Sequence, residues 1–141
     1  MNQQVLYQWT NEIATHLPSL NSWQTANVSL FSQGVILAES CQQQQIARQV
    51  ACGERVESAA RRFRRFLDNE RFSLAAFFAD WTRWVVSGLP ESERVSVLVD
   101  ETKLGDRLAA MVVGVAWEGR CIPYGIKTNA QEEIRRQAAC R

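Results

Sequence analysis

The residues from Val95 to Lys127 constrain the fold most, because they predict three consecutive strands joined by short links. The run 95–99 is rich in β-branched residues and precedes the polar residues Asp100 to Thr102, where we expect the first strand to end. A longer run, 108–117, is apolar on both faces, which is typical of a central strand. Links this short connect antiparallel neighbours. The stretch therefore predicts an antiparallel sheet with residues 108–117 in its middle strand.

The ends of the middle strand carry turn signals. Residues 103–107 form a polar link before it, and Glu118-Gly119 after it is typical of a two-residue hairpin. The chain then returns as a third strand at 120–127. Pro123 lacks an amide hydrogen, so it fits only an edge strand or a bulge. We expect the third strand at an edge of the sheet.

The residues before the sheet predict helices. Apolar residues recur at helical spacing over residues 5–17, and Pro18 ends that helix. A polar connector is expected at 20–25, followed by a second helix at 28–37 with Gly34 as a weak point. Near the sheet, Ser73 is a suitable N-cap for another helix. Its large apolar residues share one side and are expected in the core: Leu74, Phe77, Phe78, Trp81, Trp84 and Val85.

A glycine turn at Gly53 separates two further helices. The second has apolar residues at i, i+3, i+4 and i+7 between positions 56 and 67. Four arginines fall between them and are expected on the opposite half of the helix: Arg61, Arg62, Arg64 and Arg65. A short helix, a turn and a basic second helix predict a helix-turn-helix in which these arginines contact DNA. The alternative is a solvated basic face balanced by nearby acidic residues, namely Glu54, Glu57, Asp68 and Glu70.

The composition excludes several other classes of protein. The formal net charge is only +1, so attraction to nucleic acid depends on local clustering of arginines. The first residues lack a secretory pattern and no apolar run is long enough to span a bilayer, so we expect a cytoplasmic protein with no membrane partner. The cysteines are scattered without CxxC spacing, which predicts reduced, mostly packed thiols at Cys41, Cys52, Cys121 and Cys140.

Two stretches carry a resemblance to a known family. Val97–Leu108, with the sequence VLVDETKLGDRL, is followed by an apolar strand, a glycine turn and the tetrapeptide IPYG at 122–125. This order resembles the opening of the RNase H-like catalytic domain in bacterial insertion-sequence transposases of the DDE type. The upstream sequence RRFRRFLDN, residues 61–69, resembles the amino-terminal DNA-binding region of the same enzymes. In that family the first metal-binding aspartate lies on the first strand, so the resemblance implies that Asp100 is a catalytic and metal-binding residue.

With this resemblance, the fold class is expected to be α+β. A helical amino-terminal part with a helix-turn-helix-like segment would precede the first three antiparallel strands of an incomplete RNase H-like sheet. The corresponding domains are a helical DNA-binding region at 1–90, the start of the catalytic domain at 91–127, and an irregular or frayed helical tail at 128–141. The polar linker 91–94 is the expected boundary.

The chemistry implied by the resemblance is metal-dependent phosphoryl transfer on DNA, with two Mg²⁺ ions held by acidic side chains. Asp100 would be one ligand; the alternative from sequence pattern is that it only starts a turn. Glu101 and Asp106 match none of the family's later carboxylates, and no acidic motif follows Lys127. We therefore expect a truncated transposase that has no strand-transfer activity alone and binds no Mg²⁺ stably.

The expected partner is DNA at the ends of a mobile element, together with a second copy of the chain or a full-length transposase. Two other functions stay open. One is a stand-alone helix-turn-helix regulator whose strands mediate dimerisation. The other is a non-catalytic partner or inhibitor that associates with a full-length transposase through a sheet edge.

Overall fold

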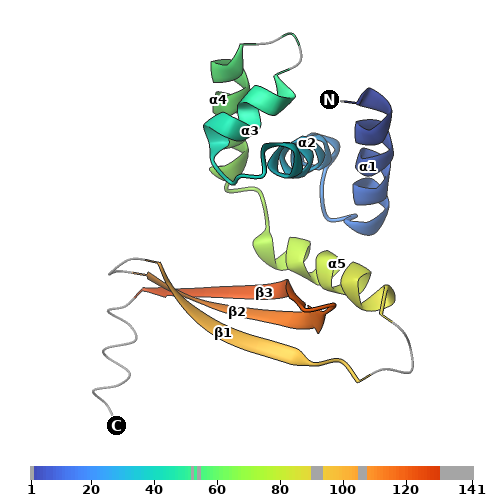
Figure 1. Ribbon diagram of the computed structural model, residues 1–141, viewed down its shortest axis with the longest axis vertical. Helices are drawn as coiled ribbons and strands as arrows, with labels where there is room; N and C mark the ends of the chain where they lie inside the picture. The colour runs from blue at the N-terminus through green and yellow to red at the C-terminus, as the bar shows by residue number, and fades with distance from the viewer. Residues whose placement is uncertain (1, 52, 54, 90–93, 105–107, 131–141) are drawn as a thin grey trace. The chain divides into compact units, whose positions relative to one another are not determined.

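The computed structural model describes residues 2–51, 53, 55–89, 94–104 and 108–130. Five helices precede three strands, so the predicted α+β class is confirmed (Figure 1). The elements are α1 (Gln3–His16), α2 (Ser22–Ala38), α3 (Gln43–Val50), α4 (Val56–Leu67), α5 (Leu74–Ser87), β1 (Val97–Leu104), β2 (Leu108–Trp117) and β3 (Arg120–Ala130). The chain forms two compact units, a helical unit at 1–80 and a strand unit at 81–141, and the division falls inside α5.

The first two helices begin at asparagine caps. Asn2 accepts a hydrogen bond from the Gln4 backbone nitrogen, and α1 ends at His16, close to the predicted stop. At α2, Asn21 and Gln24 form a reciprocal capping box, with distances of 2.9 and 3.0 Å between side-chain oxygen and backbone nitrogen. The polar connector predicted at 20–25 is therefore wrong in its second half. Residues 22–25 are the first turn of α2, and the capping box of Asn21 and Gln24 starts the helix there.

Gly34 is a contact point and not the weak point that we predicted. It is buried in the middle of α2, where α3 approaches. A Cβ atom at this position would lie 2.6 Å from Ile46 Cγ2 and 2.9 Å from Val50 Cγ1. Glycine fits this position because a side chain would have to displace the Ile46 and Val50 methyl groups of α3.

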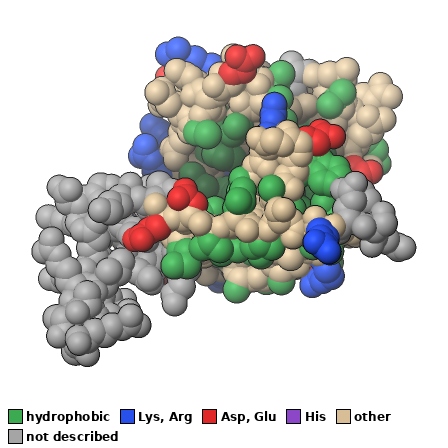
Figure 2. Space-filling view, turned by 60° about the horizontal axis from the view of Figure 1, so that its bottom comes forward, with side chains coloured by type: hydrophobic (Ala, Val, Ile, Leu, Met, Phe, Trp, Pro, Cys, Tyr) green, Lys and Arg blue, Asp and Glu red, His purple; other side chains and the backbone are tan. Residues whose placement is uncertain are grey.

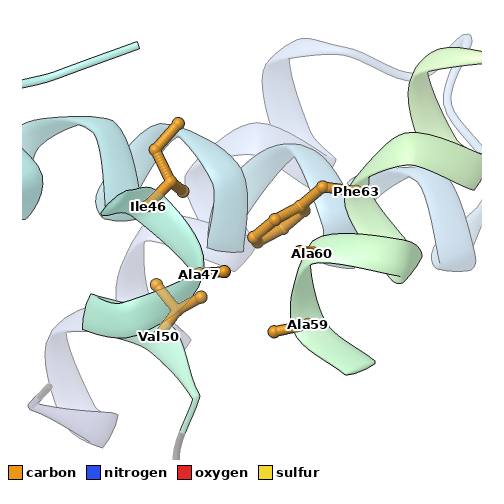
Figure 3. Packing of buried hydrophobic residues seen from close by; sticks show 6 residues of the cluster. All are labelled: Ile46, Ala47, Val50, Ala59, Ala60 and Phe63. Atoms are coloured by element: carbon orange, nitrogen blue, oxygen red, sulfur yellow. The ribbon is translucent and has the colours of Figure 1, made fainter. Parts of the chain in front are cut away.

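The core of the helical unit lies between α3 and α4. Figure 3 shows Phe63 of α4 beside the apolar side chains of α3, and the six labelled residues are all buried: Ile46, Ala47, Val50, Ala59, Ala60 and Phe63. Phe31 of α2 meets Phe63 edge-on at 5.2 Å between ring centroids. Gly53 has a φ of 78°, which allows the sharp turn before α4. The predicted bounds of α4 match the structure.

α5 begins as predicted but is less buried than predicted. The Ser73 Oγ accepts a hydrogen bond from the Ala76 backbone nitrogen, as an N-cap does. Leu74 is 62 % exposed, and the other five predicted core residues of α5 are half-buried. The buried residue of α5 is Asp80, whose Oδ2 accepts a hydrogen bond from the Ser19 backbone nitrogen at 2.8 Å. The aromatic stripe thus lines α5 without forming a closed core.

The three strands form an antiparallel sheet in the order β1-β2-β3, so the predicted central strand is confirmed (Figure 1). Glu118 and Gly119 have φ values of 46° and 74°, which makes the predicted hairpin a type I′ turn. Val113 pairs with Gly125 while Gly114 pairs with Pro123. Tyr124 is therefore the extra residue of a bulge, which agrees with the position expected for the proline.

The strands are longer than predicted. β1 continues through Asp100 to Leu104, so the strand end predicted at Asp100 and the link predicted from Lys103 are wrong. β3 continues to Ala130, so Thr128 to Ala130 are not part of an irregular tail. Polar residues are tolerated because β1 and β3 are outer strands of this sheet. The remainder of the predicted tail (131–141), Asp106 and most of the predicted linker (91–93) lie outside the described residues.

Two of the four cysteines can be placed. Cys41 and Cys121 are free thiols, as predicted, but both are exposed and not packed inside. Cys52 and Cys140 lie outside the described residues. None of the helices that the structure describes combines the length and apolar character needed to cross a bilayer.

Candidate nucleic-acid interface

The amphipathic pattern of α4 determines which of its side chains reach solvent. Ala59 and Phe63 are fully buried, and Ala60 and Phe66 are nearly so. These residues fix one side of the helix against the core. The opposite side is therefore held rigidly and faces water.

Three of the four predicted arginines lie on this solvent side. Arg61, Arg64 and Arg65 are exposed, and Arg65 Nε donates a long hydrogen bond of 3.5 Å to the Arg61 carbonyl oxygen, one turn earlier. Within the described part of the chain, none of the three forms an ion pair with a carboxylate within 4.0 Å. We call these three residues the arginine face.

Arg62 departs from the prediction. It is half-buried, and its guanidinium carbon lies 5.7 Å from the centroid of the Phe63 ring. Arg62 also lines a cavity together with residues of α1 and α2. The physical reason is angular: Arg62 and Arg64 are separated by roughly 200° around the helix, so four arginines cannot all point directly away from the core.

The acidic residues near α4 leave the arginine face available. Glu57, Asp68 and Glu70 are exposed, and none pairs with Arg61, Arg64 or Arg65 among the residues that the structure describes. Glu54 lies outside the described residues. Guanidinium groups that are not held by carboxylates can bind phosphate oxygens in two-pronged geometry. The arrangement can therefore contact a polyanion without first breaking an ion pair with those residues.

Asp100 lies in the middle of β1, opposite Val112 of β2, and is exposed. Because side chains alternate along a strand, Asp100 and Glu101 point to opposite faces of the sheet. On the next strand, Val112 in turn pairs with Ile126 of β3. The alternative that Asp100 only starts a turn is excluded, since the strand continues for four residues beyond it.

The surroundings of Asp100 do not complete a metal site. Among the described residues, no three His, Cys, Asp or Glu side chains come together in a group that could hold a metal ion. Mg²⁺ prefers several oxygen ligands in octahedral geometry. One carboxylate on an exposed strand does not fit that requirement, so no reaction step can be derived through a metal here.

Comparison of the chain with protein-family models, with curated proteins and with solved structures finds no match.

The cavity beside Arg62 was not predicted from the sequence. Trp23, Asn27 and Leu30 of α2 occur at i, i+4 and i+7, a spacing that places them on one side of a helix. Leu6 and Thr10 of α1 have the same four-residue spacing. These two patterns could have indicated a shared surface. The connector expected at 20–25 overlaps the first turn of α2, which carries Trp23.

Proposed function

We propose that the helical unit binds double-stranded DNA through the arginine face of α4. The observation that supports this most strongly is that Arg61, Arg64 and Arg65 are exposed on a helix whose other side is buried in the core. The helix holds the backbone positions of the three arginines at a constant spacing, so binding has to order their side chains but not the chain that carries them. Phosphate contacts of this kind supply most of the affinity of nonspecific DNA binding.

The order of α3, a glycine turn and α4 supports a helix-turn-helix as the form of this contact. In such motifs the second helix enters the major groove while the first crosses the backbone. α4 would be the recognition helix, and arginine can pair with the acceptor edge of guanine as well as with phosphate. Arg62, the fourth arginine predicted to contact DNA, lines the cavity and is not part of the arginine face.

We further propose that the chain is related to the DDE transposases of insertion sequences. The bound DNA would then be the ends of a mobile element, and Asp100 would correspond to the first metal-binding aspartate of that family. The antiparallel order β1-β2-β3, with Asp100 on β1, is compatible with this proposal. The resemblance in sequence remains its basis. A gel-shift comparison of the element's own ends with random DNA tests it, because a transposase-related chain prefers the ends, whereas equal binding to both sequences contradicts the relation.

The binding proposal has a direct test in DNA affinity. Replacing Arg61, Arg64 and Arg65 by Gln should weaken binding to a duplex by roughly tenfold or more at low salt, because three phosphate contacts are lost. The matched control replaces Arg83, Arg94 and Arg120 by Gln, which removes the same number of positive charges from the strand unit. An equal loss in both variants would mean that only net charge matters, and would overturn the assignment to α4.

A further inference from the structure

The two outer edges of the three-stranded sheet differ in how well they are protected. On β3, the Pro123 carbonyl oxygen accepts a hydrogen bond from Trp81 Nε1 of α5 at 2.7 Å. The Tyr124 carbonyl oxygen accepts one from Thr82 Oγ1 at 3.2 Å. Proline, a bulge and a covering helix are devices by which proteins prevent a sheet edge from pairing further. The β3 edge has all three and is therefore protected against another strand.

The outer edge of β1 lacks these devices. β1 has a neighbouring strand on one side only, and it pairs with β2 in an unbroken register from Val97 to Leu104 (Figure 1). Its sequence contains no proline. Residues 94–101 are all exposed, including the valines at positions 95, 97 and 99. A regular and apolar edge of this kind can pair with a further strand.

The hydrogen bonds to β2 determine which backbone groups of β1 face outward. The Ala116 backbone nitrogen donates to the carbonyl oxygen of Ser96, which is its direct partner in the register, at 2.9 Å. In antiparallel sheets, residues that bond to the neighbouring strand alternate with residues that do not. The even-numbered residues from Ser96 to Asp100 therefore direct their N–H and C=O groups to β2. The valines at 95, 97 and 99 direct theirs to the outer edge.

The sequence of this edge is complementary to itself in antiparallel orientation. Residues 94–100 read RVSVLVD. When Val97 lies opposite Val97 of a second copy, Val95 lies opposite Val99, and Arg94 lies opposite Asp100 at both ends. The valine pairs fall where backbone groups face outward, so each pair exchanges two hydrogen bonds and stacks β-branched side chains. The charged pairs fall at the alternate positions, where opposing side chains come closest.

The charges select this register and a second copy as the partner. A shift of the centre to Ser96 or Leu98 separates Arg94 from Asp100, and a centre at Asp100 places like charges opposite each other, which is unfavourable. Asp100 is exposed, and a carboxylate has several acceptor positions on two oxygens. It can therefore bind the second copy's Arg94 in addition to its contacts within its own chain.

We propose that two copies of the chain pair through their β1 edges, antiparallel and centred on Val97, into one continuous sheet. The contact is isologous, because the same residues contribute from both copies. Association stops at the dimer, since the β3 edges at the two ends of the joined sheet are protected. The proposal uses residues of the strand unit only and does not depend on DNA binding through α4.

Charge exchange at the two ends of the contact tests both the edge and the register in the full chain. Analytical ultracentrifugation over a dilution series should show that the parent chain dimerises. Arg94→Asp places aspartates opposite each other at both ends, and Asp100→Arg does the same with arginines. Each variant should therefore dimerise about tenfold more weakly or worse.

The two single variants should restore each other. In an equimolar mixture, every aspartate of the Arg94→Asp chain faces an arginine of the Asp100→Arg chain, so a mixed dimer should form with about the parental affinity. Three results would overturn the proposal: a monomeric parent chain, single variants that dimerise as the parent does, or a mixture that dissociates as readily as the single variants.

A matched pair of lysine variants tests the centre of the contact. Val97→Lys places two lysines opposite each other at the centre and should weaken dimerisation about tenfold or more. Val86→Lys makes the same change at another exposed valine of the strand unit, on α5, and should dimerise as the parent chain does. Both should keep the parental circular dichroism spectrum, because both positions are exposed. Equal dimerisation in the two variants would contradict pairing through β1.

Discussion

Among the described residues, the helical unit contains most of the buried apolar side chains, whereas the strand unit contains few of them. In the helical unit, Ile13, Ile46 and Phe63 are at most 2 % exposed. In the strand unit, Val97 and Val99 of β1 are 53 % and 64 % exposed. Hydrophobic side chains accordingly remain visible at the surface in Figure 2. The stability of the helical unit therefore depends on interior packing, whereas many apolar residues of the strand unit contribute little to a closed core.

The largest expected effect is the loss of Phe63. Replacing it by Ala should lower the free energy of unfolding of the helical unit by about 3–5 kcal/mol, because the ring is fully buried between helices. The control is Val99→Ala on β1, where we expect a change of no more than about 1 kcal/mol. Urea denaturation followed by far-ultraviolet circular dichroism measures both. Comparable losses in the two variants would remove the distinction between the units.

The next effect concerns two glycines in the two units. In Gly34→Ala the new methyl group would meet Ile46 and Val50 of α3, which costs about 1–3 kcal/mol. Alanine regains about 1 kcal/mol of helix propensity, so the net destabilisation should reach about 2 kcal/mol at most. Gly125→Ala is the control, since a Cβ atom there meets nothing within 4 Å. Thermal unfolding of both variants tests the difference, and a more stable Gly34→Ala chain would contradict the close helix contact.

The amphipathic part of the fold could be predicted because its signal is local. The bounds of α4 and the central position of β2 follow from apolar spacing alone. Gly34 could not be interpreted correctly in this way, since helix propensity describes one helix and its contact is with another. The first strand was expected to end at Asp100 because polar residues follow its β-branched run, yet β1 continues to Leu104 as an outer strand of the sheet.

The candidate site was predictable to a similar extent. The spacing of the arginines placed Arg61, Arg64 and Arg65 on the exposed side of α4. It could not place Arg62 in a cavity, because that depends on how α1 and α2 pack beside α4. Tertiary packing thus divided four neighbouring arginines between two surfaces.

A smaller effect is expected at a hydrogen bond between α1 and α2. Trp9 Nε1 donates to Ser32 Oγ at 2.8 Å in a partly buried position. Ser32→Ala should cost about 1 kcal/mol, because the indole N–H loses its acceptor. Ser87→Ala in the strand unit, at an exposed helix end, should change stability by no more than about 0.5 kcal/mol. Calorimetric melting temperatures compare the two, and an equal shift would indicate that the Trp9 contact contributes nothing.

The salt dependence of DNA binding tests the central claim most directly. If Arg61, Arg64 and Arg65 each neutralise one phosphate, they contribute roughly −2.7 to the slope of log affinity against log salt concentration. The parent chain should therefore show a slope steeper by that amount than the chain in which all three are Gln. Identical slopes for the two chains, or a flat response in the parent, would contradict DNA binding through α4.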